Sequence, residues 1–282
     1  MQHIDVVVVG AGISGIGAAY NLKTRCPNKS FTILEGRSNL GGTWDLFKYP
    51  GIRSDSDMHT MGFKFKPWRS PKTIADAPSI LSYLNETVDE FDIRKKIQFD
   101  KKVISAKWSS LDALWNLQVE DQNDKTLEEM TCNILYLCGG YYNYDEGYTP
   151  EFKNVGAFEG EVIHPQKWPE DLDYTNKEVI VIGSGATAVT IVPSMAEKVK
   201  HITMLQRSPT YYFAAPDEDK IGNFIKKFTS DRLGYFLVRW KNILMQRIML
   251  NRLRKHPEKT KEMLINHVKE HLGPDYDVGK HF

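Results

Sequence analysis

The sequence contains little cysteine and no long apolar run. Its three cysteines, Cys26, Cys132 and Cys138, form no CxxC pair, which argues against the common cysteine-based metal sites. An odd number of cysteines without such a pair predicts free thiols in a reducing compartment. No stretch reaches the roughly 18 unbroken apolar residues of a membrane span, and the first residues lack the pattern of a signal peptide. We therefore expect a cytoplasmic protein without a metal.

The sequence also lacks an excess of charge of either sign. It has 37 Lys and Arg residues against 36 Asp and Glu residues, so the formal net charge is +1. This balance gives no general reason to expect a nucleic-acid partner. Apolar residues make up 41% and charged residues 26% of the 282 residues. These proportions are typical of a soluble globular protein, and the length allows one large domain or two ordinary ones.

The N-terminal segment has the pattern of a βαβ unit. Residues 4–9 are apolar and largely β-branched, which predicts a buried parallel strand. Residues 15–23 then predict a helix, and residues 31–34 predict a second strand. A strand, a tight turn and a helix in this order are the framework of many dinucleotide-binding domains.

The turn of this unit carries a GxGxxG motif formed by Gly10, Gly12 and Gly15. Gly10 makes the turn, Gly12 lets the backbone approach a pyrophosphate, and Gly15 lets the helix pack on the strand. The helix N-terminus offers free N–H groups to the phosphates. Glu35, twenty residues after Gly15, is placed to accept hydrogen bonds from a ribose. FAD and NAD share this fingerprint, and a packed turn without a ligand is the alternative.

The middle of the chain predicts one loop, one helix and three strands. Residues 36–72 show no clear period and are rich in Gly, Pro, Arg, Ser and Asp, so we expect a long loop of the kind that is usually functional. Pro78 is placed to open a helix whose apolar side runs from Ile80 to Phe91. The strands are expected at residues 103–108, 114–120 and 133–138.

The opening pattern repeats from residue 178. Residues 179–182 predict a strand, residues 186–198 a helix and residues 201–205 another strand. The turn between the first strand and the helix carries a GxGxxA motif. Its residues are Gly183, Ser184, Gly185, Ala186, Thr187 and Ala188. The repeat predicts a second nucleotide site in the same chain.

This second fingerprint favours NADPH over NADH. Glu35 lies 25 residues after Gly10, and the same offset from Gly183 reaches Ser208, next to Arg207. A carboxylate at this place would repel a 2′-phosphate, whereas a guanidinium binds it through charge-assisted hydrogen bonds. We therefore expect Arg207 and Ser208 to contact NADPH. The alternative is that Arg207 is a solvated surface residue.

After Pro216 the sequence changes to long helical patterns, and no third strand of the second unit follows. Between Phe224 and His256, nine Lys or Arg residues stand against one acid, Asp231. We interpret residues 217–282 as a helical insertion with a solvated basic face. Contact of these helices with a membrane surface is a less favoured alternative, based on their basic and amphipathic character.

Two further segments resemble motifs of Baeyer–Villiger monooxygenases. Residues 41–55 read GGTWDLFKYPGIRSD and are similar to the flavin-side motif of these enzymes. Residues 158–169 match their linker motif, FxGxxxHxxxWP, at every specified position. Related flavin monooxygenases that oxidise nitrogen or sulfur have a similar motif without the final Trp-Pro. Residues 41–63 also resemble a bacterial branch with prodrug-activating members, and the whole resemblance covers essentially the entire chain.

The resemblance implies further site residues. Besides the fingerprint, the implied FAD contacts are Ser14, Gly42, Thr43, Trp44, Asp45, Leu46, Asp55 near the isoalloxazine ring, and Val103 through its backbone. Arg53, Ser54 and Asp55 are implied to approach the nicotinamide. For His164 in the linker motif the resemblance implies a conformational role, and a loop histidine bonded to the backbone is the alternative.

The resemblance implies an FAD- and NADPH-dependent monooxygenase. In that cycle NADPH reduces FAD, and O₂ then forms a C4a-peroxyflavin. This intermediate converts a ketone to an ester or lactone, or oxygenates a sulfide. Non-catalytic nucleotide binding and oxidation of nitrogen or sulfur are the alternatives. We also expect the chain to be truncated, because nothing in it returns to complete the first sheet and the family's catalytic arginine would lie beyond Phe282.

The expected fold is α/β, with two Rossmann-like dinucleotide-binding domains built on parallel sheets, a helical insertion, and the C-terminal part of the fold missing. Four domain segments are predicted. They are the first half of an FAD-binding domain (1–140), a linker (141–175), a partial NADPH-binding domain (176–216) and the helical insertion (217–282).

Overall fold

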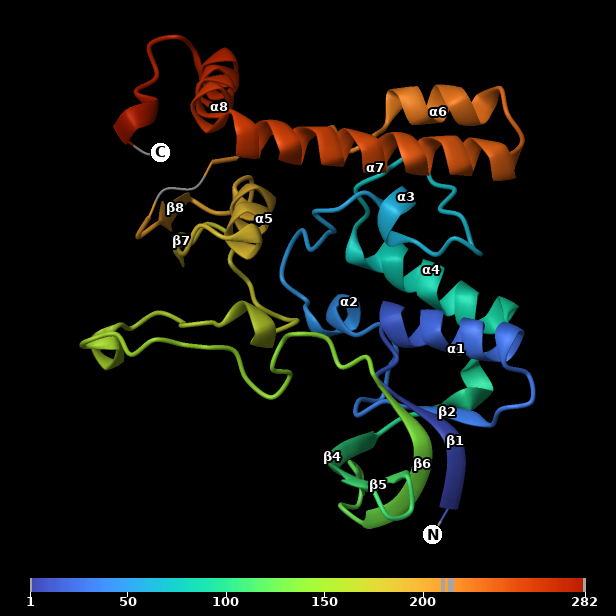
Figure 1. The fold of residues 1–282 in the computed structure, drawn as a ribbon. Helices are drawn as coiled ribbons and strands as arrows, with labels where there is room; N and C mark the ends of the chain where they lie inside the picture. The colour runs from blue at the N-terminus through green and yellow to red at the C-terminus, as the bar shows by residue number, and fades with distance from the viewer. Residues whose placement is uncertain (1, 209–210, 213–215, 281–282) are drawn as a thin grey trace. The chain divides into compact units, whose positions relative to one another are not determined.

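The computed structural model describes residues 2–208, 211–212 and 216–280 (Figure 1). The chain divides into two compact units. The first comprises Met1–Lys48 and Ala77–Glu170, and the second comprises Tyr49–Asp76 and Asp171–Phe282. Both units are therefore discontinuous in sequence. The predicted domains were instead divided by the cofactor that each segment was expected to bind, and these boundaries stay a prediction.

The first unit is built on a six-stranded sheet with the order β3-β2-β1-β6-β5-β4. Its strands are β1 (Gln2–Val9), β2 (Phe31–Leu34), β3 (Ile97–Gln98), β4 (Lys101–Ser109), β5 (Leu114–Asp121) and β6 (Leu127–Leu137). Strands β3, β2, β1 and β6 are parallel to one another. Strand β5 pairs antiparallel with both β6 and β4. The expected parallel sheet is thus confirmed, and an antiparallel meander extends it.

Helices pack beside this sheet. They are α1 (Ile13–Arg25), α2 (Thr43–Leu46) and α4 (Ala77–Glu90), with 3₁₀ turns η1 (Arg94–Lys96), η2 (Val155–Ala157) and η3 (Pro165–Lys167). Helices α1 and α4 lie side by side (Figure 1). The side chains of Val7, Ile16 and Ile33 are fully buried, because β1 and β2 are apolar and α1 turns its apolar side inward. This core fixes the turn between β1 and α1.

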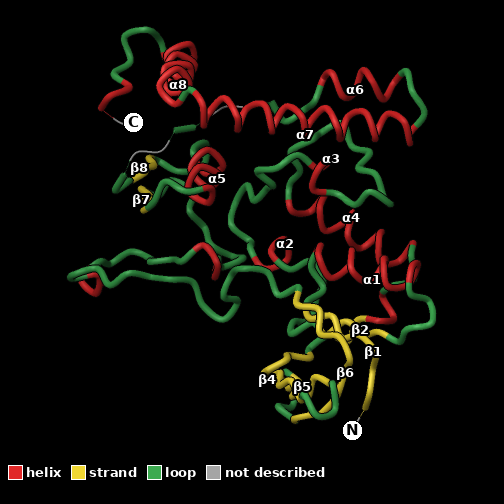
Figure 2. The backbone as a smooth tube through the Cα atoms, viewed as in Figure 1, coloured by secondary structure: helices red, strands yellow, loops and turns green. Residues whose placement is uncertain are grey.

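The second unit contains the second fingerprint and most of the helices. Its elements are α3 (Met58–Met61), β7 (Glu178–Ile182), α5 (Ala186–Met195), β8 (His201–Leu205), α6 (Lys220–Lys227), α7 (Asp231–Lys255), α8 (Pro257–Leu272) and η4 (Val278–Lys280). Strands β7 and β8 are parallel and form a two-stranded sheet beside α5 (Figure 2). No third strand joins them among the described residues, as expected.

Three sequence expectations needed correction. The loop predicted at residues 36–72 contains the one-turn helices α2 and α3, which are too short to show a period. Strand β6 begins at Leu127 rather than at residue 133, because its first part is polar and pairs antiparallel with β5. Helix α5 ends at Met195 rather than at residue 198; Pro193 lies inside it and removes one helical hydrogen bond.

The three cysteines are free thiols, as expected. Cys26 is exposed, Cys132 is buried and Cys138 is half-buried. Among the described helices, none combines the length and the apolar character that crossing a lipid bilayer requires. The cytoplasmic location stays a prediction.

Candidate functional site

Two glycines of the first fingerprint are required by the protein itself. Gly10 has a φ of +103°, and a Cβ added to it would lie 2.6 Å from the carbonyl oxygen of Cys138. A Cβ on Gly15 would lie 1.9 Å from the carbonyl oxygen of Gly10. The turn and the first turn of α1 can therefore close only with glycine at both positions.

Gly12 is different, because its surroundings leave room for a side chain. Its φ is −78°, which any residue adopts. A Cβ added there would lie 3.7 Å from the Cα of Gly42, an ordinary van der Waals distance. Gly12 is also the N-cap of α1, where its missing side chain leaves the helical N–H groups open. The chain itself does not demand a glycine here, whereas a pyrophosphate close to the backbone would.

Glu35 is held against this turn by two backbone groups. Its Oε2 atom accepts a hydrogen bond from the N–H of Ala11 at 2.7 Å, and its Oε1 atom accepts one from the N–H of Arg37 at 3.1 Å. Burial raises the pKa of this carboxyl, although both hydrogen bonds oppose the shift. Each carboxylate oxygen keeps a further acceptor site for a ribose hydroxyl.

The flavin-side residues Gly42, Thr43, Trp44, Asp45 and Leu46 lie beside the first fingerprint. The N–H of Gly41 donates to the carbonyl oxygen of Ala11 at 3.0 Å, and Gly42 has a φ of +56° as the N-cap of α2. The Arg37 Nη2 atom lies 2.6 Å from Asp45 Oδ2, and Arg37 Nη1 donates to the Gly42 carbonyl oxygen at 3.3 Å. The structure thus brings together two motifs that are about thirty residues apart.

Two residues that contact the Gly42–Leu46 segment, Arg37 and Tyr144, were not indicated by the sequence. The Tyr144 hydroxyl forms a hydrogen bond with Thr43, and burial raises the pKa of Tyr144. The Arg37 guanidinium lies 5.9 Å from the centroid of the Tyr144 ring. The position of Arg37, two residues after Glu35, was an available signal, whereas Tyr144 comes from the predicted linker and had none.

Ser14 and Val103 are placed in ways that fit their implied roles. Ser14 is exposed in the first turn of α1, where a hydroxyl can reach a phosphate. Val103 is half-buried and its side chain packs against the apolar core of the first sheet. Val103 lies in β4 at the edge of the sheet, opposite Val119 of β5. The FAD contacts of both residues stay predictions.

The second fingerprint repeats the geometry of the first. Gly183 has a φ of +130°, and its N–H donates to the carbonyl oxygen of Leu205 at 2.8 Å. Gly185 has a φ of −81° as the N-cap of α5, and a Cβ added there would have no neighbour within 4 Å. As at Gly12, the chain does not require this glycine. Ala186, Thr187 and Ala188 form the first turn of α5.

Arg207 and Ser208 lie next to this second turn. The Ser184 hydroxyl donates to the carbonyl oxygen of Ser208 at 3.4 Å, which links the glycine turn to the end of β8. Arg207 is exposed, so its guanidinium is accessible to a ligand. The hydroxyl of Tyr212, which the sequence did not indicate, donates to the Ser184 carbonyl oxygen at 2.9 Å.

The segment with Arg53, Ser54 and Asp55 belongs to the second unit and packs on its fingerprint helix. The hydroxyl of Tyr49 shares a hydrogen bond with Thr187 in α5, and burial raises the pKa of Tyr49. Gly51 has a φ of +76°, and an added Cβ would lie 1.9 Å from the Ser194 hydroxyl oxygen in α5. Arg53 and Asp55 are exposed, whereas Ser54 is buried. The contact of Asp55 with FAD stays a prediction.

His164 caps the short turn η3. Its Nδ1 atom accepts a hydrogen bond from the N–H of Gln166 at 3.2 Å, and its ring lies against Gly147, where an added Cβ would be 2.0 Å from the ring. The side chain of Gln166 donates to the carbonyl oxygen of Asn143 at 2.6 Å. The motif histidine thus holds two stretches of the predicted linker together, and its conformational role stays a prediction.

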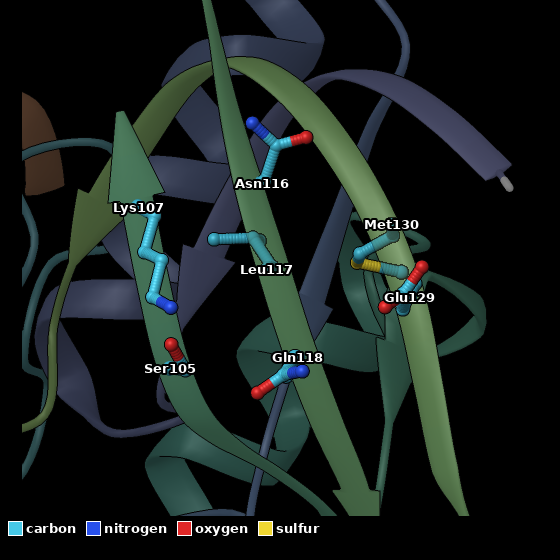
Figure 3. A pocket seen from close by; sticks show the side chains of 7 residues that line it. All are labelled: Ser105, Lys107, Asn116, Leu117, Gln118, Glu129 and Met130. Carbon is cyan, nitrogen blue, oxygen red and sulfur yellow. The ribbon is translucent and has the colours of Figure 1, made fainter. Parts of the chain in front are cut away.

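The hollow shown in Figure 3 is separate from the first fingerprint. It is lined by Ser105, Lys107, Asn116, Leu117, Gln118, Glu129 and Met130 on β4, β5 and β6. Met130 pairs with Gln2, whereas Leu137 pairs with Val9 beside the glycine turn. Seven residues of strand, or about 23 Å, separate these two points. The hollow therefore lies away from the first glycine turn. Among the described residues, no cluster of three or more His, Cys, Asp or Glu could hold a metal ion.

Comparison with known proteins assigns the family. A family model described as flavin-binding monooxygenase-like matches residues 4–270. The chain belongs to this family. The FAD-containing monooxygenase EthA of Mycobacterium tuberculosis is 51% identical over 282 residues, which are 100% of this chain and 57% of EthA. The chain of this flavin-binding monooxygenase-like protein thus spans little more than half the length of this relative.

Solved structures of monooxygenases share the fold. Cyclohexanone monooxygenase with ε-caprolactone bound is 30% identical with a TM-score of 0.68, covering 76% of this chain and 42% of that one. The complex of OTEMO with FAD and NADP is 31% identical with a TM-score of 0.63, covering 74% and 39%. FAD and NADP are therefore cofactors found in this family, as the sequence predicted. The predicted α/β fold with two nucleotide-binding motifs is also confirmed.

Proposed function

We propose that this protein serves an FAD- and NADPH-dependent monooxygenation in which one oxygen atom of O₂ is inserted next to a ketone carbonyl. The observation that carries this proposal is the pair of glycine turns. In each turn one glycine, Gly12 or Gly185, faces space that the described protein leaves open. Each of these glycines is the N-cap of a helix that follows a strand, where open space next to free backbone N–H groups suits a pyrophosphate. The arrangement occurs twice, which supports two nucleotide sites.

The first turn is proposed as the FAD site. The N-terminus of α1 at Gly12 would hold the pyrophosphate, and the Glu35 carboxylate would accept hydrogen bonds from the ribose. Arg37 fixes Gly42 and Asp45 beside the turn, so the Gly42–Leu46 segment is held ready before a ligand arrives. When bound, FAD supplies the chemistry that activates O₂. The protein supplies position and keeps water away.

The second turn is proposed as the NADPH site. The N-terminus of α5 at Gly185 would hold the second pyrophosphate, and Arg207 would pair with the 2′-phosphate. Arg53 and Asp55 are exposed on a segment that packs on α5 through Tyr49. We propose that these two side chains meet the nicotinamide end of the cofactor.

A small ketone is proposed as the substrate, with a sulfide as a second substrate class. Support comes from Trp168 and Pro169, which end the linker motif, and from the similarity to cyclohexanone monooxygenase with a lactone bound. The Trp-Pro ending speaks against an enzyme specialised for nitrogen or sulfur. Asp55 near the flavin and His164 in the linker are proposed as functional residues of this reaction.

The proposal is tested in two steps. The purified 282-residue chain is titrated with FAD while flavin fluorescence and visible absorbance are recorded, and saturable binding is expected. The FAD-loaded protein is then supplied with NADPH, O₂ and cyclohexanone, and products are analysed by gas chromatography. Lactone formation coupled to NADPH consumption supports the proposal. Absence of flavin binding would overturn it, and cofactor binding without turnover would favour a nucleotide-binding role.

A further inference from the structure

Helix α3 is too short to satisfy its own backbone. A helix of four residues leaves most of its carbonyl groups without an intrahelical partner. Two carbonyl oxygens at its C-terminal end, those of His59 and Gly62, accept hydrogen bonds from Arg239 Nη1 at 2.7 and 3.1 Å. Arg239 belongs to α7 and is 180 residues away from His59 in the sequence. One guanidinium of α7 therefore caps α3.

The same face of α7 also holds the N-terminal end of α3. Asp57, the N-cap, accepts a hydrogen bond from the N–H of Thr60 at 2.9 Å. Its two carboxylate oxygens also accept hydrogen bonds from Asn242 Nδ2 at 2.8 Å and from Gln246 Nε2 at 3.0 Å. Arg239, Asn242 and Gln246 are spaced i, i+3 and i+7, so they form one row on the helix.

A buried tyrosine supports this row one turn earlier. The hydroxyl of Tyr235 lies 2.8 Å from Arg239 Nη1 and donates to the carbonyl oxygen of Phe63 at 3.2 Å. The Arg239 guanidinium lies 5.9 Å from the centroid of the Tyr235 ring. The guanidinium is therefore fixed on its own helix before it reaches α3, which makes the contact a rigid one.

The residues just before α3 are anchored as well. Ser54 is 1% exposed, and its N–H donates to the carbonyl oxygen of Ala75 at 2.8 Å. The N–H of Ala75 lies 3.3 Å from the Ser54 hydroxyl, and Arg53 forms a β-bridge with Asp76. Asp55 is thus exposed between two anchors, Ser54 on one side and Asp57 on the other.

We propose that the row Arg239, Asn242 and Gln246 of α7 positions the Arg53–Asp55 segment for reduction of the flavin by NADPH. The three are positioning residues, because they act through α3 and its N-cap, which their side chains contact. The inference rests on the proposed NADPH site. It gives the helical insertion a role in the redox step, where the sequence favoured a solvated face, with membrane-surface contact as the alternative. A small displacement of Asp55 should strongly reduce the rate of flavin reduction, since misplacement by about 1 Å can slow a reaction about 100-fold.

The test compares three variants of the 282-residue chain. Arg239→Ala removes the cap of α3, Arg239→Lys keeps the charge and part of the donor capacity, and Arg247→Ala removes an exposed arginine elsewhere on α7. Hydrogen–deuterium exchange of the peptide covering residues 53–63 is measured without cofactors, together with the melting temperature. We expect exchange in this peptide to rise about ten-fold in Arg239→Ala, less in Arg239→Lys and not at all in Arg247→Ala.

The second readout is the rate of flavin reduction after rapid mixing of the FAD-loaded chain with NADPH. Arg239→Ala is expected to reduce this rate about ten-fold or more while FAD content is retained, and Arg239→Lys is expected to recover part of it. Unchanged exchange in Arg239→Ala, or faster exchange with an unchanged reduction rate, would overturn the inference. If the unaltered chain binds FAD and NADPH but its flavin is not reduced, the proposed function fails, and the inference that rests on it is overturned as well. Should Arg239→Ala fail to fold, the comparison of Arg239→Lys with Arg247→Ala carries the test.

Discussion

The carboxylate of Glu35 accepts a hydrogen bond from the backbone N–H of Ala11, the residue between the first two glycines of the N-terminal turn, at 2.7 Å. The bond joins the end of β2 to the turn after β1 across a sequence separation of 24 residues. It fixes the carboxylate before any ligand is present. A preformed acceptor lowers the entropy that must be lost when a ribose binds.

Glu35→Gln should separate stability from ligand binding. Burial raises the pKa of Glu35, so its ionised form is disfavoured in the folded protein. At pH values above the pKa that Glu35 has in the unfolded chain, keeping this carboxylate ionised and buried lowers the free energy of unfolding. As the pH falls below that pKa, this penalty disappears. Glutamine removes this titration, but it also turns an amide NH₂ group towards one of the two backbone N–H donors. The part of the pH dependence of the melting temperature that comes from Glu35 should therefore disappear, while FAD affinity falls about ten-fold. Calorimetry across pH and fluorescence titration measure the two quantities, and an unchanged pH dependence of the melting temperature would contradict this account.

Gly12→Ala should weaken FAD binding without unfolding the protein. The added methyl group meets only an ordinary contact with Gly42, yet it occupies the space proposed for the pyrophosphate. Gly156→Ala is the control, because an added Cβ there meets no clash either, with no neighbour within 4 Å, and the residue lies in η2. We expect melting temperatures within about 4 °C of the parent for both variants, corresponding to less than about 1 kcal/mol, and lost FAD affinity for Gly12→Ala alone. Equal FAD affinity in the two variants would show that the ligand does not approach Gly12.

Arg207→Ala should weaken NADPH far more than NADH. Loss of one charge-assisted contact corresponds to about 1.5–3 kcal/mol, or about a 10- to 150-fold change in affinity. Isothermal titration with each cofactor measures the two losses, and Arg252→Ala on the exposed side of α7 controls for the lost charge. Similar losses for NADPH and NADH would mean that Arg207 does not bind the 2′-phosphate.

The second unit should lose stability when the pH falls from 6.5 towards 4, because of His59. Neither ring nitrogen of this fully buried side chain has a hydrogen-bond partner within the part of the chain that the structure describes. Burial, together with Lys226 and Lys241, lowers its pKa from 6.5 to about 4, while Asp57 and Asp219 oppose the shift. In this window the unfolded chain binds more protons than the folded one, so the free energy of unfolding falls as pH falls, by up to about 3 kcal/mol.

His59→Leu removes this titration. Its melting temperature at pH 5 should exceed that of the parent, with a smaller difference at pH 7.5. His201→Leu, at an exposed position of β8, is the control and should keep the parent's pH dependence. A pH profile of His59→Leu that matches the parent would show that another group causes the acid loss.

The fold was predicted best where its strands are short and apolar. The strand at residues 31–34 and the strand at 201–205 were predicted with the bounds that the structure has. The two glycine turns were also found, since a strand, a turn and a helix appear in one local window. By contrast, α2 is held by Arg37 and α3 by its cap Asp57 and by Arg239 of α7, and no local period indicates either helix.

The candidate sites were predicted where the signal is local and missed where it is not. Glu35 and Arg207 follow from a fixed offset within a βαβ unit. Tyr144 and Tyr212 join the sites from loops, and Arg239 reaches α3 across 180 residues. Contacts of this kind depend on packing that a single sequence does not display.

The discontinuity of the second unit decides how this protein can be recombined with its relatives. A gene segment that encodes only residues 171–282 would leave behind Tyr49–Asp76, and with it the partner of Thr187 and the carbonyl acceptors of Arg239. Chimeras that exchange the second fingerprint should therefore transfer both segments from the same parent. Crossovers placed at residues 48/49, 76/77 and 170/171 would keep each unit whole. Such a chimera needs three junctions, whereas the order of the two fingerprints along the chain suggests a single junction between them.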